Sequence, residues 1–194
     1  DNVTLVDVRT DPIAEITSTG VRLQSGAEHR ADIIVFATGF DAMTGTLLRM
    51  GIRGRDGLTL EQAWEAGPRN YLGLQVPGFP NMFTITGPGS PSVLCNMPVP
   101  IEQHVEWITD CIAHLRQHAI ERIEAQPEAT DEWVEQVNEA ARASLLSEVD
   151  HSWYVGANVP GKPRVFMPYA GGMTRYRAIC DEVAANGYSG FVLD

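Results

Sequence analysis

Three side chains near the middle of the sequence have the types and the spacing of metal ligands. Cys111, His114 and His118 are three and four residues apart, which would place one thiol and two imidazoles on one face of a helix. Zinc proteases of the His-Glu-x-x-His type also need a glutamate directly after the first histidine, and Leu115 stands there instead. We therefore predict that these residues hold no metal and flank the polar side of a helix.

A glycine-rich loop begins at residue 87. Gly87, Gly89 and Ser92 nearly match the Gly-x-Gly-x-x-Gly motif that binds the pyrophosphate of a dinucleotide. However, Pro88 and Pro91 remove backbone N–H donors from the loop, and no acidic residue follows on a strand where a ribose would need one. The pattern therefore favours a tight loop beside a substrate over a pyrophosphate loop.

Four other residues could contact a ligand. Gly39 ends an apolar run and lets the backbone approach a ligand closely, although an ordinary glycine at a strand end fits as well. Trp153 lies in a polar, Gly/Pro-rich segment, where its indole N–H needs a partner unless the ring only anchors a loop. Lys162 and Arg164 could reach a phosphate, but such side chains on loops are more often solvated.

The composition limits the classes of protein. The chain has 194 residues, 44 % of them hydrophobic and 20 % charged, which is enough for a domain with a core. Its net charge of −11 disfavours nucleic acid and anionic membranes as partners, because both require basic surfaces. Three cysteines give no disulfide framework, and no apolar run reaches about 18 residues. We expect a cytoplasmic protein without a membrane segment.

Strands are expected mainly in the first half of the chain. Residues 3–6, 13–16 and 20–23 are short β-type runs separated by turn residues. Residues 31–37 and 81–86 are apolar runs of the kind found in strands that are buried on both faces of a parallel sheet. These strands are too few for a complete doubly wound domain.

Most helices are expected in the second half. The clearest is 101–119, which begins after Pro98 and Pro100, and its apolar face consists of Ile101, Val105, Ile108, Ile112 and Leu115. A second helix is expected at 131–146 with Thr130 as its cap, and its face consists of Trp133, Val137, Ala140 and Ala141. A weak helix is expected at 60–65 and a last one at 176–185, which Asn186-Gly187 would end. Residues 147–169 are expected to be extended.

Three segments carry a resemblance to a known family. Residues 32–41 (DIIVFATGFD) resemble the motif that closes the FAD domain of flavoproteins with two dinucleotide-binding domains. Residues 87–97 resemble an active-site loop, and residues 152–167 (SWYVGANVPGKPRVFM) resemble a late segment that closes over the cofactors. Together they resemble Baeyer–Villiger monooxygenases, and the match extends through essentially the whole chain.

The resemblance implies an α/β fold. The chain would be the C-terminal part of a flavoprotein with two dinucleotide-binding domains, an incomplete Rossmann-like sheet with appended helices. Residues 1–36 would supply the last strands of the NADP-binding domain and the return crossover, and residues 37–194 the C-terminal part of the FAD-binding domain. The implied cofactors are FAD and NADPH.

The resemblance also assigns site residues. It places four residues at the cofactors: Gly39, Asn96, Met97 and Trp153. It places four others in the wall of the substrate pocket: Ser92, Val93, Leu94 and Cys95. The Met97 backbone would lie at the flavin, where the positive start of the following helix would stabilise the negative charge of the reduced ring. The alternative is a plain proline-kinked entry into a core helix. No catalytic residue is expected in this segment.

The implied reaction inserts one oxygen atom of O2 into a ketone through a peroxyflavin and gives an ester or a lactone. The two Gly-x-Gly-x-x-Gly motifs, the family fingerprint and the catalytic arginine are missing from the sequence and are expected upstream. We therefore expect the ketone, O2 and that missing portion as partners, and an isolated chain that is inactive. Two alternatives stay open: a non-catalytic fragment or interaction module, and a related flavin enzyme that hydroxylates nitrogen or sulfur.

Overall fold

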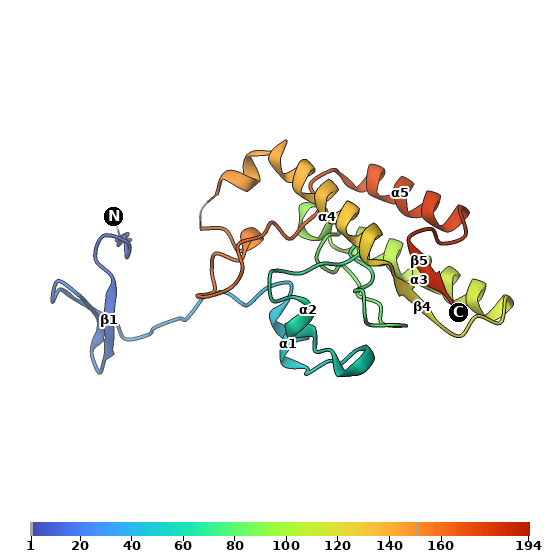
Figure 1. Cartoon of the computed structure of the whole chain (residues 1–194). Coiled ribbons are helices and arrows are strands. Elements are labelled where there is room, and N and C mark those ends of the chain that lie inside the picture. Colours follow the sequence, from blue (N-terminus) through green and yellow to red (C-terminus); the bar gives the residue numbers. More distant parts are fainter. Residues whose placement is uncertain (1, 150) are drawn as a thin grey trace. The chain divides into compact units, whose positions relative to one another are not determined.

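The computed structural model describes residues 2–149 and 151–194, and it describes the backbone but not the side chains of Val93 and Ser147. The chain separates into two compact units, Asp1–Gly39 and Phe40–Asp194, and each is described by itself (Figure 1). Within the described ranges, no helix is both long and apolar enough to cross a membrane. The predicted division of a whole enzyme at residues 36 and 37 stays a prediction.

The first unit contains a three-stranded antiparallel sheet. Its strands β1 (Ile13–Thr17), β2 (Gly20–Leu23) and β3 (Glu28–Arg30) are paired in chain order. Thr17 pairs with Gly20, which leaves a two-residue hairpin turn between them. The strands expected at 13–16 and 20–23 are confirmed, β3 was not predicted, and residues 3–6 form no strand.

The buried strand expected at 31–37 is absent from this structure. The segment is irregular, and Ile33 and Val35 are 82 % and 80 % exposed. Its apolar run fits a strand with neighbours on both sides, and the described residues of this unit provide no strand that pairs with it. The strand expected at 81–86 is also wrong, since that segment bends at Asn81 and Thr86, whose φ angles are 59° and 52°.

The second unit begins with two short helices, α1 (Gly45–Arg49) and α2 (Leu60–Ala63), which pack on a small core of their own. The buried members of that core are Leu60, Trp64, Val76 and Phe79. Thr59 caps α2, because its hydroxyl accepts the Gln62 N–H while the Gln62 side chain accepts the Thr59 N–H. The weak helix predicted at 60–65 is therefore confirmed in a shorter form.

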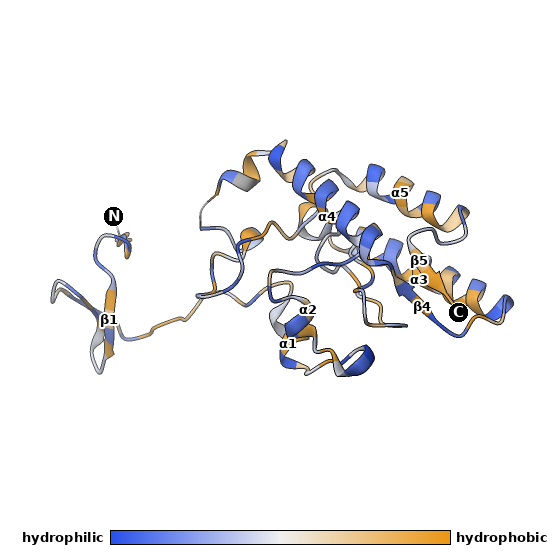
Figure 2. Cartoon of the chain, viewed as in Figure 1, coloured by the Kyte–Doolittle hydropathy of each residue, from blue (hydrophilic) through white to orange (hydrophobic). Residues whose placement is uncertain are grey.

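Three long helices and a two-stranded sheet surround the main core. They are α3 (Pro98–Gln117), α4 (Pro127–Arg142), α5 (Met173–Ala185) and the antiparallel pair β4 (Ile123–Ala125) and β5 (Phe191–Leu193) (Figure 1). Most of α4 is hydrophilic in Figure 2, and its buried side chains are Thr130, Trp133, Val137 and Ala141. The predicted face of α4 is thus largely confirmed. The helix starts earlier, at Pro127, so Thr130 lies inside it and is not its cap. Asn186 and Gly187 end α5 as predicted.

The predicted apolar face of α3 is confirmed only at Ile108 and Leu115, which contact the main core. Ile101, Val105 and Ile112 are exposed, and the core contacts come from the neighbouring stripe of Pro100, Gln103, His104, Trp107, Cys111 and Leu115. The physical reason lies in α5: the Trp107 indole N–H donates to the Cys180 carbonyl over 2.9 Å, and His104 Nε2 lies 2.7 Å from the Tyr176 hydroxyl. Hydrogen-bonded aromatic side chains therefore fix the rotation of α3 against α5. Cys111 is buried and does not lie on a polar face.

The fold class is mixed α/β, but the described residues contain no parallel sheet of the kind expected. Both sheets of the described residues are antiparallel. A parallel pair requires a crossover, usually a helix that packs on the sheet. The two short helices between residues 37 and 81 instead pack on their own small core with Val76 and Phe79.

Candidate functional site

The loop of residues 84–97 is held in place by backbone hydrogen bonds to two other segments. Thr84 N donates to Leu74 O over 2.8 Å, and Gly89 N donates to Met167 O over 2.7 Å. In return, Tyr169 N donates to Ser90 O over 2.7 Å. Segments before and after the loop in the sequence therefore fix its backbone conformation.

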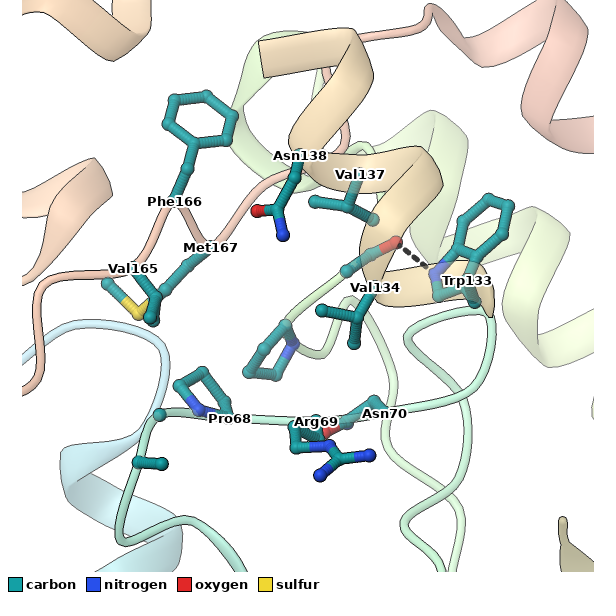
Figure 3. A pocket seen from close by; sticks show the side chains of 14 residues that line it. Pro68, Arg69, Asn70, Trp133, Val134, Val137, Asn138, Val165, Phe166 and Met167 are labelled. Carbon is teal, nitrogen blue, oxygen red and sulfur yellow. Dashed lines mark hydrogen bonds between the residues drawn. The ribbon is translucent and has the colours of Figure 1, made fainter. Parts of the chain in front are cut away.

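Helix α4 also holds this loop in place, through the side chain of Trp133. The Trp133 indole N–H donates to the Gly89 carbonyl over 3.0 Å, the dashed contact in Figure 3. A cavity of about 140 Å³ adjoins this contact, and its labelled walls in Figure 3 include Val134, Val137 and Phe166. Trp133 is almost fully buried, so its predicted core role is confirmed, and through Gly89 it also holds the loop.

An open hollow of about 560 Å³ lies in front of this loop, and we call it the loop hollow. Three of the predicted site residues, Ser92, Met97 and Trp153, line it together although they come from distant parts of the sequence. Its other walls are Ala42, Met43, Leu47, Phe83, Thr84, Ile85, Thr86 and Gly87. None of these residues is charged, so the loop hollow suits an uncharged, largely apolar group with a few polar atoms.

The backbone around the loop hollow is strained at three positions. Met43, Thr86 and Ser92 have φ angles of 68°, 52° and 44°, a left-handed conformation that side chains other than glycine rarely adopt. Such strain persists only where the surrounding contacts enforce it, and it is concentrated at functional sites. Ser92 is almost fully buried, and its hydroxyl lies 3.4 Å from the Met43 sulfur.

Helix α3 begins at the edge of the loop hollow. Its cap residue is Met97, and Pro98 and Pro100 in the first turn have no N–H groups. Val99 N donates to Asn96 O and Ile101 N to Met97 O. Among the described residues nothing accepts the N–H of Met97. The helix start therefore offers fewer free N–H donors than one without these prolines would, and its cap residue Met97 lines the loop hollow.

Trp153 begins the 3₁₀ turn Trp153–Val155 and is half-buried. Ser152 caps this turn by accepting the Tyr154 N–H over 3.1 Å, and the rings of Trp153 and Tyr154 lie 4.4 Å apart. Tyr154 O in turn accepts the Met167 N–H over 2.8 Å. The indole of Trp153 is thus placed beside the loop hollow by local contacts, and in the described structure its N–H has no acceptor.

The remaining predicted site residues lie outside the lining of the loop hollow. Leu94 and Cys95 are half-buried, Asn96 is exposed, and the side chain of Val93 lies outside what is described. The Cys95 thiol lies 3.3 Å from Ser92 O, and burial raises the pKa of this thiol, which disfavours a nucleophile. Gly39 ends the first unit with a φ of 85° and open space around it.

Lys162 is not solvated, contrary to the sequence-based expectation. Its ammonium lies 2.6 Å from Asp41 Oδ1 and 3.0 Å from Ala42 O, and its side chain is only 10 % exposed. This ion pair was missed because Asp41 and Lys162 are 121 residues apart. Met43 and Thr86 were also missed, since no sequence pattern marks a left-handed residue that is not glycine.

The lining of the loop hollow fits one part of the two implied cofactors, FAD and NADPH, better than the other. The uncharged lining, the Met97 N–H and the Trp153 indole fit the flat ring end of a flavin or a nicotinamide, which needs hydrogen-bond donors and apolar contact. Pyrophosphate groups need cationic or multiple backbone donors, and the lining of the loop hollow provides no cation. The residues therefore fit the ring portion of such a cofactor and not its phosphates.

Comparison with known proteins places the chain in context. No protein-family model matches it. A Baeyer-Villiger monooxygenase of Pseudooceanicola batsensis is 44 % identical over 194 residues, which are 100 % of this chain and 35 % of that protein. An acetone monooxygenase (methyl acetate-forming) of Gordonia sp. is 48 % identical over 194 residues, 100 % of this chain and 36 % of the relative. A phenazine N-monooxygenase of Lysobacter antibioticus is 41 % identical over 192 residues, 99 % of this chain and 35 % of the relative.

Solved structures give the same result. The closed crystal structure of cyclohexanone monooxygenase matches with a TM-score of 0.92 at 44 % identity, covering 97 % of this chain and 35 % of that one. Oxidized steroid monooxygenase bound to NADP matches with a TM-score of 0.86 at 51 % identity, covering 100 % and 35 %. The chain thus spans about a third of the length of the proteins it matches. It is homologous along its whole length to one segment of the FAD- and NADP-dependent Baeyer–Villiger monooxygenases.

Proposed function

We propose that the chain is the C-terminal third of a Baeyer–Villiger monooxygenase that uses FAD and NADPH to convert a ketone into an ester or a lactone. The observation that carries this proposal is that the whole chain aligns with 35 % of the length of such an enzyme at 44 % identity. The loop hollow supports it independently, because an uncharged pocket with strained walls suits a neutral ketone and the ring end of a cofactor.

The chain's own residues would bind and orient the reacting groups. Bound FAD, reduced by NADPH and supplied with O2, provides the oxygen-transfer chemistry. The Met97 N–H would donate to a flavin ring oxygen or nitrogen, and the Trp153 indole N–H to an oxygen of NADP. Leu47, Phe83 and Ile85 would exclude water from the hollow, where water would compete with the transfer.

The loop after Gly89 would form one wall of the substrate pocket. We assign this role to Ser92, Val93, Leu94 and Cys95, with Asn96 and Gly39 as further cofactor contacts. Of these, Ser92 supports the assignment most directly, since it lines the loop hollow and is fixed in a strained conformation. Within the family, the chain as a whole resembles phenylacetone monooxygenase, and we propose a ketone of that kind as the first substrate to examine.

A second function is supported by one specific relative. The phenazine N-monooxygenase aligns over 99 % of the chain, so oxidation at a nitrogen atom is compatible with the same segment. An uncharged pocket suits either a ketone or a neutral aromatic nitrogen compound. The ketone is favoured because two relatives are named for ketones, the acetone monooxygenase at 48 % identity and a cyclohexanone 1,2-monooxygenase of Acinetobacter sp. at 40 %, against one phenazine N-monooxygenase at 41 %.

The test uses the full-length protein that carries this chain. FAD absorbance, NADPH consumption and product identity by mass spectrometry are measured with a panel of linear, aromatic and cyclic ketones, and with phenazine as the rival substrate. The proposal expects stoichiometric FAD and an ester or lactone that carries one atom from ¹⁸O2. Oxygen incorporated only into phenazine would replace it by the second function. A protein that neither binds FAD nor consumes NADPH would contradict both.

A further inference from the structure

A buried chain of hydrogen bonds connects helices α3 and α5 to the loop hollow. His104 on α3 and Tyr176 on α5 are both fully buried, and His104 Nε2 lies 2.7 Å from the Tyr176 hydroxyl oxygen. His104 Nδ1 accepts the backbone N–H of Thr86 over 2.9 Å. The Tyr176 hydroxyl donates to the carbonyl oxygen of Leu72 over 2.5 Å. Two side chains therefore hold one N–H and one C=O of two separate segments.

The directions of these bonds determine the protonation of His104. Because Thr86 donates to Nδ1, that nitrogen carries a lone pair and no proton. The Tyr176 proton is used on Leu72 O, so the remaining bond must run from a protonated Nε2 to the hydroxyl oxygen. His104 is thus neutral, with its proton on Nε2. Burial is consistent with this state, since it lowers the pKa of His104 to about 4 and raises that of Tyr176 well above its ordinary value.

The two held backbone groups belong to strained residues. Leu72 and Thr86 have φ angles of 56° and 52°, and neither is glycine. Thr86 lines the loop hollow, and the next residue, Gly87, has no room for a side chain, since a Cβ would lie 2.4 Å from Thr84 Oγ1. The peptide between Thr86 and Gly87 therefore cannot shift easily on the Gly87 side. The preceding peptide, between Ile85 and Thr86, contains the N–H that donates to His104 Nδ1, and this bond fixes it.

We propose that His104 is a positioning residue of the loop hollow: through Nδ1 it holds Thr86 in its left-handed conformation, and Tyr176 holds the imidazole in the required orientation. The catalytic consequence rests on the proposed function, whereas the structural part does not. A displaced Thr86 would move the wall between Thr84 and Ser92, against which the substrate and the cofactor ring would lie. The role is specific to one nitrogen atom, which makes it testable.

Two variants separate this role from simple packing. His104→Asn keeps an acceptor near the position of Nδ1 and loses the contact with Tyr176, whereas His104→Gln keeps a donor near the position of Nε2 and loses the acceptor for Thr86. Each variant loses one hydrogen bond from the same buried site, so the two should be similar in thermal stability. Hydrogen–deuterium exchange of the Thr86 amide is measured in the full-length holoenzyme. The Gly89 amide, which donates to Met167 O, serves as the internal control.

The proposal expects His104→Gln to accelerate exchange at Thr86 about tenfold, the effect of one lost hydrogen bond, and His104→Asn at most about threefold, with Gly89 unchanged in both. The ester formed per NADPH consumed should fall in His104→Gln and be largely kept in His104→Asn. Equal exchange at Thr86 in the two variants, or no change in either, would overturn the proposal. An enzyme without ketone oxidation contradicts the proposed function alone, because the exchange comparison still decides the role of His104.

A third variant covers a failure to fold. If His104→Gln yields no folded protein, Tyr176→Phe decides the question, since it removes only the hydroxyl and keeps the ring that packs in the core. Loss of this hydroxyl frees the imidazole to rotate, so exchange at Thr86 should rise about threefold while Gly89 is unchanged. A Thr86 amide as protected as in the parent would show that Tyr176 and His104 only fill the core.

Discussion

Lys162 and Asp41 form an ion pair between two of the segments that carry the family resemblance. Lys162 Nζ lies 2.6 Å from Asp41 Oδ1, and the two side chains are 10 % and 27 % exposed. Asn158 adds a bond of 2.9 Å from its side-chain amide to Phe40 O. The start of the second unit is therefore attached to the segment that contains Trp153 by one charged and one neutral contact.

Lys162→Met should destabilise the protein more than an ordinary surface mutation does. It keeps most of the apolar stem and leaves the Asp41 carboxylate partly buried without its cation. We expect the free energy of unfolding to fall by about 1–3 kcal/mol, below the ~3–5 kcal/mol of a fully buried pair because Asp41 is in part solvated. Urea unfolding of the full-length protein measures this change.

The matched control is the pair of Arg142 and Glu135 on α4, whose side chains are 60 % and 58 % exposed. Arg142→Met should cost at most about 0.5 kcal/mol. A double-mutant cycle of Lys162→Met with Asp41→Asn should give a coupling of about 1 kcal/mol or more. Strictly additive effects would show that the two side chains are only neighbours.

Trp153→Phe should weaken the retention of NADP and leave FAD bound. The substitution keeps an aromatic ring and removes only the indole N–H, which has no acceptor in the described structure. Loss of one hydrogen bond to a ribose or amide oxygen should cost about 1–2 kcal/mol, or roughly five- to thirtyfold in the dissociation constant of NADP. Isothermal titration with NADP⁺ and the FAD absorbance of the same sample measure both quantities.

Trp133→Phe is the counterpart, because the Trp133 indole N–H already donates to Gly89 O inside the protein. Trp133→Phe, as the control, should therefore lower the thermal midpoint of the protein. The opposite pattern, in which Trp153→Phe loses stability and FAD while its affinity for NADP is unchanged, would mean that Trp153 anchors a loop and contacts no cofactor.

The isolated 194-residue chain should bind FAD weakly or not at all. The lining of the loop hollow fits a ring system but provides no cation for the pyrophosphate, so most of the cofactor's binding groups would stay in water. Desalting after incubation with FAD, followed by an absorbance spectrum, is sufficient as a test. Stoichiometric flavin after desalting would show that the chain contains a complete cofactor site.

The helices could be predicted from the sequence because their signals are local. The apolar spacing on α4 and the Asn186-Gly187 stop after α5 depend on residues within a few turns of each other. The strand predictions were wrong where strand formation depends on a pairing partner. Residues 31–37 have the composition of a buried strand, but a strand forms only when it pairs with another. β4 and β5, which are 66 residues apart at Ala125 and Phe191, showed no local signal at all.

The site was predicted in part for a similar reason. Resemblance to a family led to Ser92, Met97 and Trp153, which line one hollow in the structure. Thr86 and His104 were missed because their roles come from contacts across 18 residues and, through Tyr176, across 72 more. The apolar pattern of α3 also led away from His104, since it suggested a face that includes the exposed Ile101 and Ile112 and does not include His104.

The pH dependence of stability should report the neutral state of His104. Its pKa is lowered to about 4 in the folded protein, against about 6.5 for a histidine in water, because it is buried. Between these values the unfolded chain binds a proton that the folded protein does not, so stability falls as the pH is lowered from 6.5 towards 4. The full contribution is about 3 kcal/mol.

His104→Asn removes this titration while it keeps the acceptor for Thr86. The thermal midpoint of the full-length protein should therefore decrease less in the variant than in the parent between pH 7 and pH 5, although the variant starts from a lower value. Other groups titrate in both proteins, so only the difference between the two curves is interpreted. Parallel curves would mean that His104 is as easily protonated in the folded protein as in water. The assignment of a neutral His104 in the hydrogen-bond chain from Thr86 to Leu72 would then be wrong.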